Sequence, residues 1–219
     1  MNNYKLIIFD WDGTLMDSIA RIVSSMKSAA LNCQLVVPTT KQVKDIIGLS
    51  LPTALKCLFP SATKEQLANM VEQYKYQYID EDKTPAPLFD NALTLLKALS
   101  AESKLLAVAT GKARQGLQNV FSTTQTGHFF HASRCADEAL SKPNPQMILS
   151  LLDELNVKPE HAVMIGDSKL DMAMAQASGI DRIGVTMGVH DKVTLSHYKP
   201  RAIVNSLTEL QQLLLSTEV

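Results

Sequence analysis

The sequence predicts an α/β protein that contains a doubly wound parallel sheet and an inserted helical region. Short, uninterrupted apolar runs alternate with amphipathic segments along most of the chain, and such runs are typical of parallel strands covered on both faces. The alternation stops between about Met16 and Pro87, where only helical patterns occur. A chain of 219 residues is long enough for one such core with a large insertion.

The apolar runs define the predicted strands. They lie at Leu6–Phe9, Leu105–Ala109, Ala162–Ile165, Ile183–Val185 and, more weakly, Ala202–Val204. A further short strand is indicated around Phe129 and Phe130, between His128 and His131. The alternation of these runs with helices favours one continuous parallel sheet.

Amphipathic helices are predicted between the strands. One apolar stripe runs along residues 92–99, and another along residues 147–155 with Asn144 as its N-cap and Pro145 in its first turn. A last helix is predicted to begin after a cap at Ser206. These helices have the length and apolar spacing needed to cover both faces of the sheet.

The helical insertion begins at the carboxyl end of the first strand. Residues 1–15 and 88–219 are expected to form the sheet-containing core, and residues 16–87 an all-α domain. Open α/β sheets bind ligands at the carboxyl ends of their strands, so an insertion that starts there would cover the binding site. The helical region is therefore a candidate lid.

The composition excludes several classes of protein. The formal net charge is −1, so no basic field is available for nucleic acid. The three cysteines show no CxxC spacing, which argues against a disulfide framework or a zinc site. The sequence contains no apolar run long enough to span a bilayer. We expect a cytoplasmic protein, monomeric or homodimeric, that binds neither membranes nor nucleic acid.

Two carboxylates follow the first strand, in the motif Asp10-Trp11-Asp12-Gly13-Thr14. Residues two apart on an extended chain point to the same side, so Asp10 and Asp12 can converge on one small volume. Two acids held together repel each other unless a cation or a proton is shared between them. The pair therefore suits a nucleophile, a general acid/base and a metal ion.

Three later segments carry polar residues to the same edge of the sheet. Thr110 and Gly111 follow the second predicted strand and offer a hydroxyl and a backbone N–H to an anion. Lys142 precedes a helix and supplies a positive charge for a phosphate. Asp167 and Asp171 follow a later strand and offer the oxygen ligands that Mg²⁺ prefers.

These motifs, in this order and spacing, resemble those of the haloacid dehalogenase (HAD) superfamily of phosphatases. Asp10-x-Asp12-Gly13-Thr14 is similar to the family's first motif, Thr110-Gly111 to its second, Lys142-Pro143 to its third and Gly166-Asp167-x3-Asp171 to its fourth. The chain most resembles the phosphoglycolate phosphatase-like branch with an α-helical (C1) cap. The resemblance implies a Rossmann-like core, Mg²⁺, a small phosphorylated metabolite as substrate and an aspartyl-phosphate intermediate.

The resemblance also implies a role for each matching residue. Asp10 would attack phosphorus, and Asp12 would protonate the leaving group and then activate water. Thr110, Gly111 and Lys142 would hold the phosphoryl oxygens. The implied Mg²⁺ ligands are Asp10, the backbone carbonyl of Asp12, and Asp167, with Asp171 supporting them.

The chain departs from the family pattern in the helical cap. Relatives often place an arginine a few residues before a glycine in a cap loop, but here the segment is Lys44-Asp45-Ile46-Ile47-Gly48. Lys44, Gly48 and Ser50 are predicted to contact the substrate, with Lys44 facing the leaving group. Lysine is a point charge without the guanidinium fork, so a bidentate clamp on a carboxylate is not expected from this position.

Two other functions are compatible with the motifs. A phosphomutase similar to β-phosphoglucomutase uses the same core and keeps bulk water from the phosphorylated aspartate. A phospho-receiver domain also combines aspartates, a threonine and a lysine with Mg²⁺, but this chain is too long for one and its acidic pair ends the first strand.

Overall fold

A six-stranded parallel sheet forms the centre of the molecule in the computed structural model, which describes residues 4–216. The strands follow the order β3-β2-β1-β4-β5-β6 across the sheet. Their bounds are β1 Leu6–Phe9, β2 Leu105–Ala109, β3 Ala132–Arg134, β4 Ala162–Gly166, β5 Asp181–Val185 and β6 Ala202–Val204. The doubly wound parallel sheet predicted from the alternation of strands and helices is confirmed.

Strand β1 is one of the two middle strands of the sheet, between β2 and β4, and this interior position explains why its sequence is apolar throughout. Leu6 lies opposite Leu105 of β2 on one side and Ala162 of β4 on the other. All four residues of β1 are buried, because helices cover the sheet on both faces. The acidic motif starts at the residue that follows this strand, so its position is fixed by a fully buried element of the fold.

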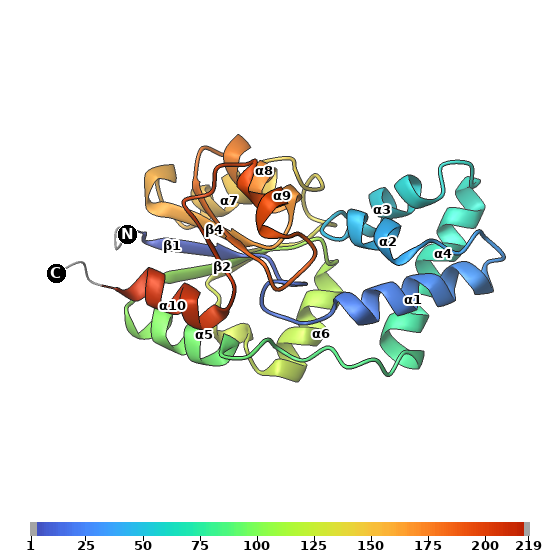
Figure 1. Cartoon of the computed structure of the whole chain (residues 1–219), viewed down its shortest axis with the longest axis horizontal. Helices are drawn as coiled ribbons and strands as arrows, with labels where there is room; N and C mark the ends of the chain where they lie inside the picture. The colour runs from blue at the N-terminus through green and yellow to red at the C-terminus, as the bar shows by residue number, and fades with distance from the viewer. Residues whose placement is uncertain (1–3, 217–219) are drawn as a thin grey trace.

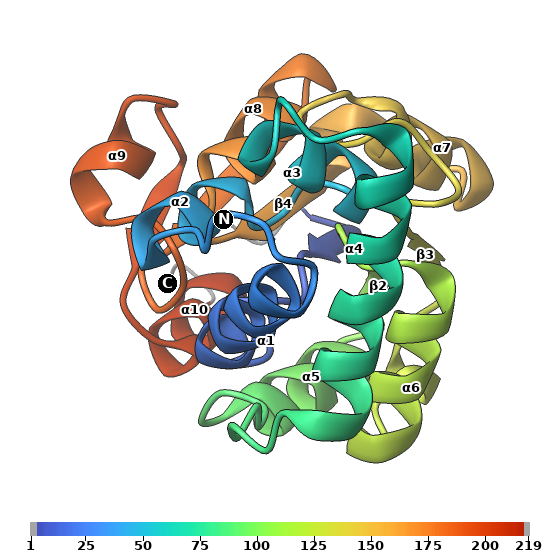
Figure 2. The ribbon, with the colours of Figure 1, turned by 90° about the vertical axis from the view of Figure 1, so that its right-hand side faces the viewer.

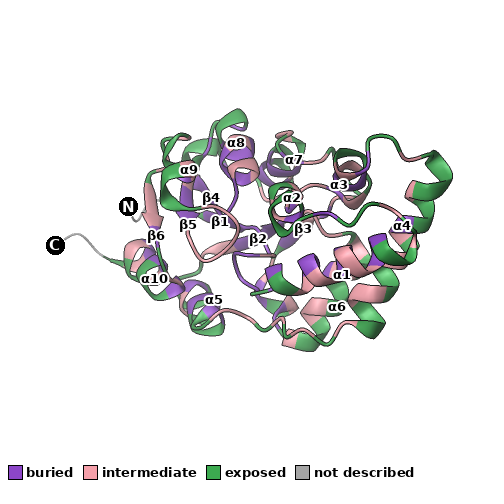
Figure 3. Ribbon diagram, turned by 45° about the vertical axis from the view of Figure 1, so that its right-hand side comes forward, coloured by how far each residue is buried: buried purple, intermediate pink, exposed green. Residues whose placement is uncertain are grey.

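Helices cover both faces of the sheet (Figure 1). Helices α5 (Ala92–Ala101), α6 (Arg114–Thr124) and α10 (Leu207–Leu215) pack on one face. Helices α7 (Gln146–Glu154) and α8 (Lys169–Ala177) pack on the other, and the short α9 (Lys192–Ser196) lies beside β6 and α8. Figure 3 shows the buried strands β1, β2 and β4 between these helices, whose outer faces are exposed.

The segment between β1 and α5 is helical, as the sequence predicts. It contains α1 (Ile19–Asn32), α2 (Thr40–Ile46), α3 (Leu51–Leu58), α4 (Lys64–Tyr76) and a π-helical turn, η1 (Gln77–Glu81). Its apolar side chains form a cluster of their own, centred on Met26, Leu55 and Met70. In Figure 2 these helices lie in front of the carboxyl ends of the strands. The division into residues 1–15 with 88–219 and residues 16–87 stays a prediction, and residues 1–3 and 217–219 lie outside the described part of the chain.

Two local predictions need correction. Residues Gly127–Phe129 form a 3₁₀ turn, η2, and the strand lies further on at Ala132–Arg134. This strand was missed because its three residues, Ala-Ser-Arg, carry no apolar run. Helix α7 begins at Gln146 with Pro145 as its N-cap, and Asn144 instead accepts a hydrogen bond from the Gln146 N–H. A second 3₁₀ turn, η3, spans Pro159–His161.

Other local signals are confirmed. Ser206 caps α10 by accepting a hydrogen bond from the Glu209 N–H. The stripe at residues 92–99 is the buried face of α5, where Leu95, Leu96 and Leu99 have no exposed surface. Each such leucine stabilises the fold by about 1.5–3 kcal/mol relative to an exposed one. Within residues 4–216, no helix has both the length and the apolar composition required to cross a membrane.

Candidate active site

Three parallel strands deliver the predicted site residues to one edge of the sheet. Asp10, Thr110 and Asp167 directly follow β1, β2 and β4, and all three are buried. The ladder hydrogen bonds continue to these positions, since the Asp10 N–H donates to the Ile165 carbonyl at 2.9 Å and the Thr110 N–H donates to the Arg134 carbonyl at 3.0 Å. The backbone at the site is therefore held by the sheet itself.

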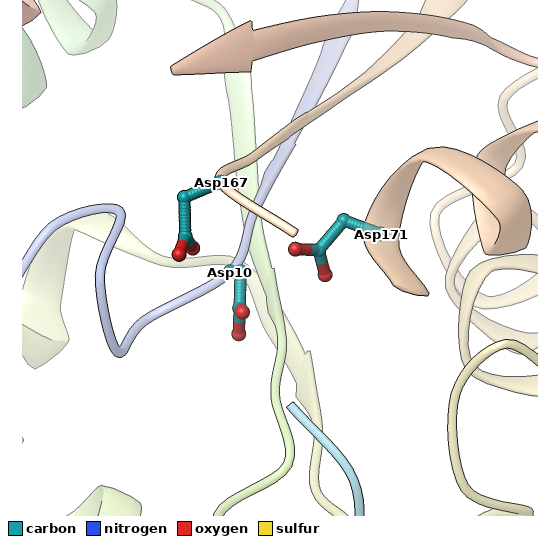
Figure 4. A group of neighbouring side chains, drawn as sticks. All are labelled: Asp10, Asp167 and Asp171. Carbon is teal, nitrogen blue, oxygen red and sulfur yellow. The ribbon is translucent and has the colours of Figure 1, made fainter. Parts of the chain in front are cut away.

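Asp10, Asp167 and Asp171 form a buried acidic trio (Figure 4). Each offers a carboxylate oxygen, and these oxygens lie within 4.8 Å of one another. Figure 4 shows that the three side chains come from the end of β1, the end of β4 and the first turn of α8. Carboxylate oxygens at this separation are a donor set for a hard divalent cation.

Lys142 connects two members of the trio. Its Nζ lies 2.8 Å from Asp10 Oδ1 and 2.7 Å from Asp171 Oδ1, and the side chain is fully buried. Burial by itself lowers the pKa of Lys142, but the attraction of Asp10 and Asp171 outweighs it and the net pKa is raised. The lysine therefore stays protonated and neutralises part of the acidic charge.

One ammonium does not balance three carboxylates. Burial raises the pKa of Asp10 well above its usual value against the attraction of Lys142, and the charges of Asp171 and Asp167 raise it further. Burial, followed by repulsion from Asp171, also raises the pKa of Asp167 to about 7. The uncompensated negative charge and the grouped oxygens fit a divalent cation, which would restore both groups to the ionised form.

The Asp167 carboxylate is fixed by two donors and two glycines. Thr14 Oγ1 donates to its Oδ1 at 2.9 Å, and the Val189 N–H donates to its Oδ2 at 2.8 Å. A Cβ at Gly188 would lie 2.0 Å from Oδ2, and one at Gly13, where φ is +81°, would lie 2.4 Å from it. Only glycine fits at these two positions, because any side chain would displace the carboxylate.

Asp171 is held by the start of α8. Ser168 accepts a hydrogen bond from the Asp171 N–H, and the Asp171 carboxylate accepts from the Ser168 N–H and from its Oγ at 2.6 Å. This capping box satisfies two donors at the helix start. It also fixes the orientation of the carboxylate that reaches Lys142.

Asp12 lies apart from the trio. Its carboxylate accepts a hydrogen bond from Ser18 Oγ at 2.5 Å and forms an ion pair with Lys112 Nζ at 3.0 Å. Asp10 and Asp12 line the same cavity, so they face one space although their carboxylates have different partners. The predicted roles of Asp12 in proton transfer and, through its backbone carbonyl, in metal binding stay predictions.

The loop after β2 meets the loop between α2 and α3. The hydroxyl of buried Thr110 accepts a hydrogen bond from the Lys112 N–H at 3.2 Å, which leaves its proton available to an anion. A Cβ at Gly111 would lie 2.7 Å from the Gly48 carbonyl oxygen. Gly48 and Gly111, both predicted to bind substrate, are therefore in close backbone contact.

Ser50 and Lys44, the other two residues predicted to bind substrate, do not take part in the contact between Gly48 and Gly111. The Ser50 N–H donates to Ser141 Oγ at 2.9 Å, and Ser50 Oγ donates to Thr53. Lys44 is half-buried in the last turn of α2. Neither is among the described residues that line the cavity over Asp10 and Asp12, and their substrate roles stay predictions.

A cavity of about 950 Å³ lies over Asp10 and Asp12, between the helical insertion and α6. Arg21 of α1, Tyr78 of η1 and Lys112 line it, and none of these three was predicted as a site residue. Lys112 could have been found from its place two residues after Thr110. Arg21 and Tyr78 carry no such signal, because their position depends on how the inserted helices meet the core.

Comparisons with known proteins agree with this arrangement. The sequence model of the family described as haloacid dehalogenase-like hydrolase matches residues 7–185. A protein named probable phosphatase IndB, from Dickeya dadantii (strain 3937), is 30% identical over 94% of this chain and 91% of its own length. A phosphoglycolate phosphatase from Mannheimia succiniciproducens is 26% identical over 95% of this chain and 97% of its own.

A solved structure extends the likeness to three dimensions. A haloacid dehalogenase-like family hydrolase from Streptococcus pneumoniae superposes with a TM-score of 0.82 at 27% identity. The match covers 96% of this chain and 98% of that one. The similarity therefore includes the helical insertion as well as the sheet.

Proposed function

This chain belongs to the haloacid dehalogenase-like hydrolase family and is a phosphatase, and on that premise we propose that it hydrolyses a small phosphorylated metabolite through a phosphorylated Asp10. The observation that carries the proposal is the meeting of Asp10, Asp167, Asp171 and Lys142 in one buried cluster under a cavity. Phosphoglycolate-like compounds and sugar phosphates are the substrate classes we expect.

In the first step, a carboxylate oxygen of Asp10 attacks phosphorus. A bond forms between this oxygen and phosphorus, while the bond from phosphorus to the ester oxygen breaks. Asp12 donates a proton to the departing oxygen, which leaves as the alcohol. The location of both carboxylates on the wall of one cavity supports this division of roles.

In the second step, water attacks the phosphorus of the acyl phosphate. Asp12 accepts the proton of the water, and the bond between phosphorus and the Asp10 oxygen breaks. Inorganic phosphate leaves, and both carboxyl groups return to their starting states. Using one carboxyl group as acid and then as base requires that it faces the cavity in both steps, and that it is protonated in the first and ionised in the second.

The phosphoryl oxygens need positive partners because negative charge spreads over them in the transition state. The Thr110 hydroxyl, the Gly111 N–H and Lys142 are the groups we assign to them. Lys142 is held in place by Asp10 and Asp171, so little side-chain entropy is lost when it binds an oxygen.

The acidic trio is the place we assign to Mg²⁺. Asp10, Asp167 and the backbone carbonyl of Asp12 would hold the ion, and Asp171 would support it through hydrogen bonds or water. When bound, Mg²⁺ would neutralise charge on the phosphoryl oxygens and orient the phosphoryl group toward Asp10. The raised pKa values of Asp10 and Asp167 support this assignment, because a dication relieves the repulsion that raises them.

The remaining assignments extend the same proposal. Residues 16–87 act as a cap over a core made of residues 1–15 and 88–219, and Gly48 with Lys44 and Ser50 contributes to the substrate-facing loop. The contact between Gly48 and Gly111 supports such a loop, since it closes one side of the cavity. The cytoplasmic location and the choice between monomer and homodimer stay predictions.

The test replaces the nucleophile without changing its size. We expect Asp10→Asn to lower the rate of p-nitrophenyl phosphate hydrolysis in Mg²⁺ by at least about a thousandfold, which is about 4 kcal/mol of transition-state stabilisation. Asp17→Asn is the matched control, because Asp17 is an exposed aspartate of the same loop. An Asp10→Asn variant with wild-type turnover would end the proposal.

A second measurement tests the intermediate directly. Nitrophenolate leaves without much help from an acid, so Asp12→Asn should still transfer the phosphoryl group to Asp10 but release it slowly. Rapid mixing should then give a burst of nitrophenolate close to one per enzyme, and mass spectrometry should find the phosphoryl group on the peptide that contains Asp10. Steady release from the first turnover, with no phosphorylated peptide, would argue against a covalent intermediate.

A further inference from the structure

Arg21 lies on the wall of the cavity without an acidic partner in the described part of the chain. Its Nε donates to the Thr84 carbonyl at 2.5 Å, and its Cζ lies 5.8 Å from the centre of the Tyr78 ring. The side chain is half-buried in helix α1. The guanidinium is therefore fixed at one nitrogen and against one ring, and its two terminal nitrogens are not used by a carboxylate of residues 4–216.

The other described cations that line the cavity have acidic partners. Lys112 pairs with Asp12 at 3.0 Å, and Lys75 pairs with Glu72 at 3.0 Å on the exposed side of α4. Lys142, in the cluster below, pairs with Asp10 and Asp171. A guanidinium that has no carboxylate partner keeps hydrogen-bond donors for an anion. Among the described residues that line the cavity, Arg21 is thus the cation without a carboxylate partner.

Most of the surrounding wall is apolar. The side chains come from α1, from the α2–α3 segment and from the end of α4 with η1, and they are Ile22, Met26, Ile46, Ile47, Leu49, Leu51, Ala54, Tyr74, Tyr78 and Ile79. A volume of about 950 Å³ accommodates far more than a two-carbon alcohol, since cavities of roughly 300–1,000 Å³ enclose drug-sized ligands. A small polar leaving group would leave this apolar surface in contact with water.

We propose that the leaving group of the substrate has an apolar or aromatic body and ends in an anion, a carboxylate or a second phosphate, that binds Arg21. This inference rests on the proposed phosphatase reaction and shifts its expected substrate from phosphoglycolate and simple sugar phosphates to a larger, less polar phosphate ester with a terminal anion. The phosphoryl group to be cleaved lies at Asp10, the body lies against the apolar wall, and the terminal anion accepts hydrogen bonds from the guanidinium.

The chemistry of Arg21 suits this task. A guanidinium presents two parallel N–H groups to a carboxylate or a phosphate, and its contact with an aromatic ring holds its plane. Lys44, at the position where relatives often have an arginine, is not among the cavity-lining residues. The guanidinium fork that Lys44, in the last turn of α2, cannot offer is thus supplied by Arg21 of α1.

The experiment compares matched substrates that differ only in the terminal anion. The wild-type enzyme in Mg²⁺ is assayed on 4-(2-carboxyethyl)phenyl phosphate and on its neutral methyl ester. A bisphosphate of similar length and phosphoglycolate complete the set. We expect kcat/KM for the carboxylate to exceed that for the methyl ester by at least tenfold, and both aromatic esters to exceed phosphoglycolate. Preference for the bisphosphate over the carboxylate would identify a second phosphate as the natural anion.

Variants then assign the preference to Arg21. In Arg21→Met the ratio of the carboxylate rate to the methyl-ester rate should fall to about one, and Arg21→Lys should retain part of it. Lys27→Met is the control, because Lys27 is a cation of the same helix that does not line the cavity and should leave the ratio unchanged. Ile79→Ser, at an exposed residue of the cavity rim, should lower kcat/KM for both aromatic esters several-fold.

The outcomes separate this inference from the proposed function. Undiminished hydrolysis by Asp10→Asn would overturn both. Hydrolysis that requires Asp10 but shows no preference for a terminal anion, or a preference that survives in Arg21→Met, would overturn the inference alone. A clear preference of the wild type for phosphoglycolate over the aromatic esters would also overturn the inference alone, because the preferred substrate would then have no apolar body to contact the apolar wall.

Discussion

Lys112 and Asp12, which both line the cavity over the acidic trio, form an ion pair of 3.0 Å. The same ammonium lies 4.9 Å from the centre of the Tyr78 ring, so one lysine contacts a carboxylate of the core and an aromatic side chain of η1. Burial by itself lowers the pKa of Lys112, but attraction to Asp12 and to Tyr78 outweighs it and the net pKa is raised. The lysine therefore stays charged while it links the two parts of the molecule.

The first prediction concerns this link. We expect Lys112→Met to lower kcat/KM by about 10- to 100-fold with the fold retained, because a partly buried ion pair of about 1–3 kcal/mol that orients Asp12 is lost. Steady-state kinetics with p-nitrophenyl phosphate and a circular dichroism spectrum check it. Lys97→Met, which removes an exposed lysine of α5, should stay within twofold of the wild type. If kcat/KM of Lys112→Met also stayed within twofold of the wild type, the ion pair would not be needed for catalysis.

The second prediction concerns metal removal and pH. The folded protein without metal retains a proton on Asp167 up to about pH 7, whereas the unfolded chain loses it near pH 4. The folded state thus binds more protons in this window, and the free energy of unfolding of the metal-free protein falls as the pH rises through it. Mg²⁺ competes with those protons, so it should stabilise the protein more at pH 8 than at pH 5.

Thermal unfolding with EDTA and with Mg²⁺ measures this difference. Mg²⁺ at about a hundred times its dissociation constant adds about 2.7 kcal/mol, which for a protein of this size raises Tm by about 5–10 °C. Asp167→Asn should abolish the increase at pH 8, and Asp153→Asn, an exposed aspartate of α7, should not. An equal rise in Tm at both pH values would contradict the titration of the trio.

The third prediction uses the crowding around Asp167. Gly188→Ala places a methyl group where it would lie 2.0 Å from Asp167 Oδ2, so the carboxylate must move. We expect the Mg²⁺-dependent rise in Tm to disappear and kcat/KM to fall by about a hundredfold or more, since a displaced ligand loses about 3 kcal/mol or more of transition-state stabilisation. Both effects can be measured on one preparation.

Gly179→Ala provides the contrast. Gly179 has φ of +70° with nothing within 4 Å of the added carbon. Its substitution should cost about 1 kcal/mol of stability through backbone strain alone. The Mg²⁺ effect and kcat/KM should be retained. If Gly188→Ala behaved in the same way, crowding of Asp167 would not be the reason for that glycine.

The sheet and the acidic cluster could be predicted because both depend on local sequence. A strand buried on both faces must be apolar, so the apolar runs of the sequence identify β1, β2 and β4. The residue that follows each of these parallel strands lies at the edge of the sheet where ligands bind. Strand β3 could not be predicted in this way. It lies at the edge of the sheet and has three residues, of which only Ala132 is buried.

The wall of the cavity could not be predicted either. Arg21 and Tyr78 occupy amphipathic segments that the sequence correctly marks as helical, but no local pattern says which core residue each helix faces. Their meeting with Lys112 depends on how the insertion docks, which is a property of the packed chain. The predicted Lys44 illustrates the same limit, since a family position does not determine where its side chain lies.

The last prediction concerns Trp11, which separates the two acids of the first motif. Its side chain is fully buried, packs edge-on against Phe121 with ring centres 5.3 Å apart, and donates from Nε1 to Met16 Sδ at 3.2 Å. Trp11→Ala would leave a large cavity beneath the acidic loop and should cost about 3–5 kcal/mol.

Urea unfolding followed by circular dichroism measures this loss. The turnover of Trp11→Ala should fall even at temperatures where the variant is folded, because the ring sets the direction of the chain between Asp10 and Asp12 and a small displacement of either carboxylate is costly. Trp11→Phe keeps an aromatic contact with Phe121 and should recover most of the stability and activity. If Trp11→Ala lost less than about 1 kcal/mol, the loop would be held by its hydrogen bonds to the sheet rather than by this ring.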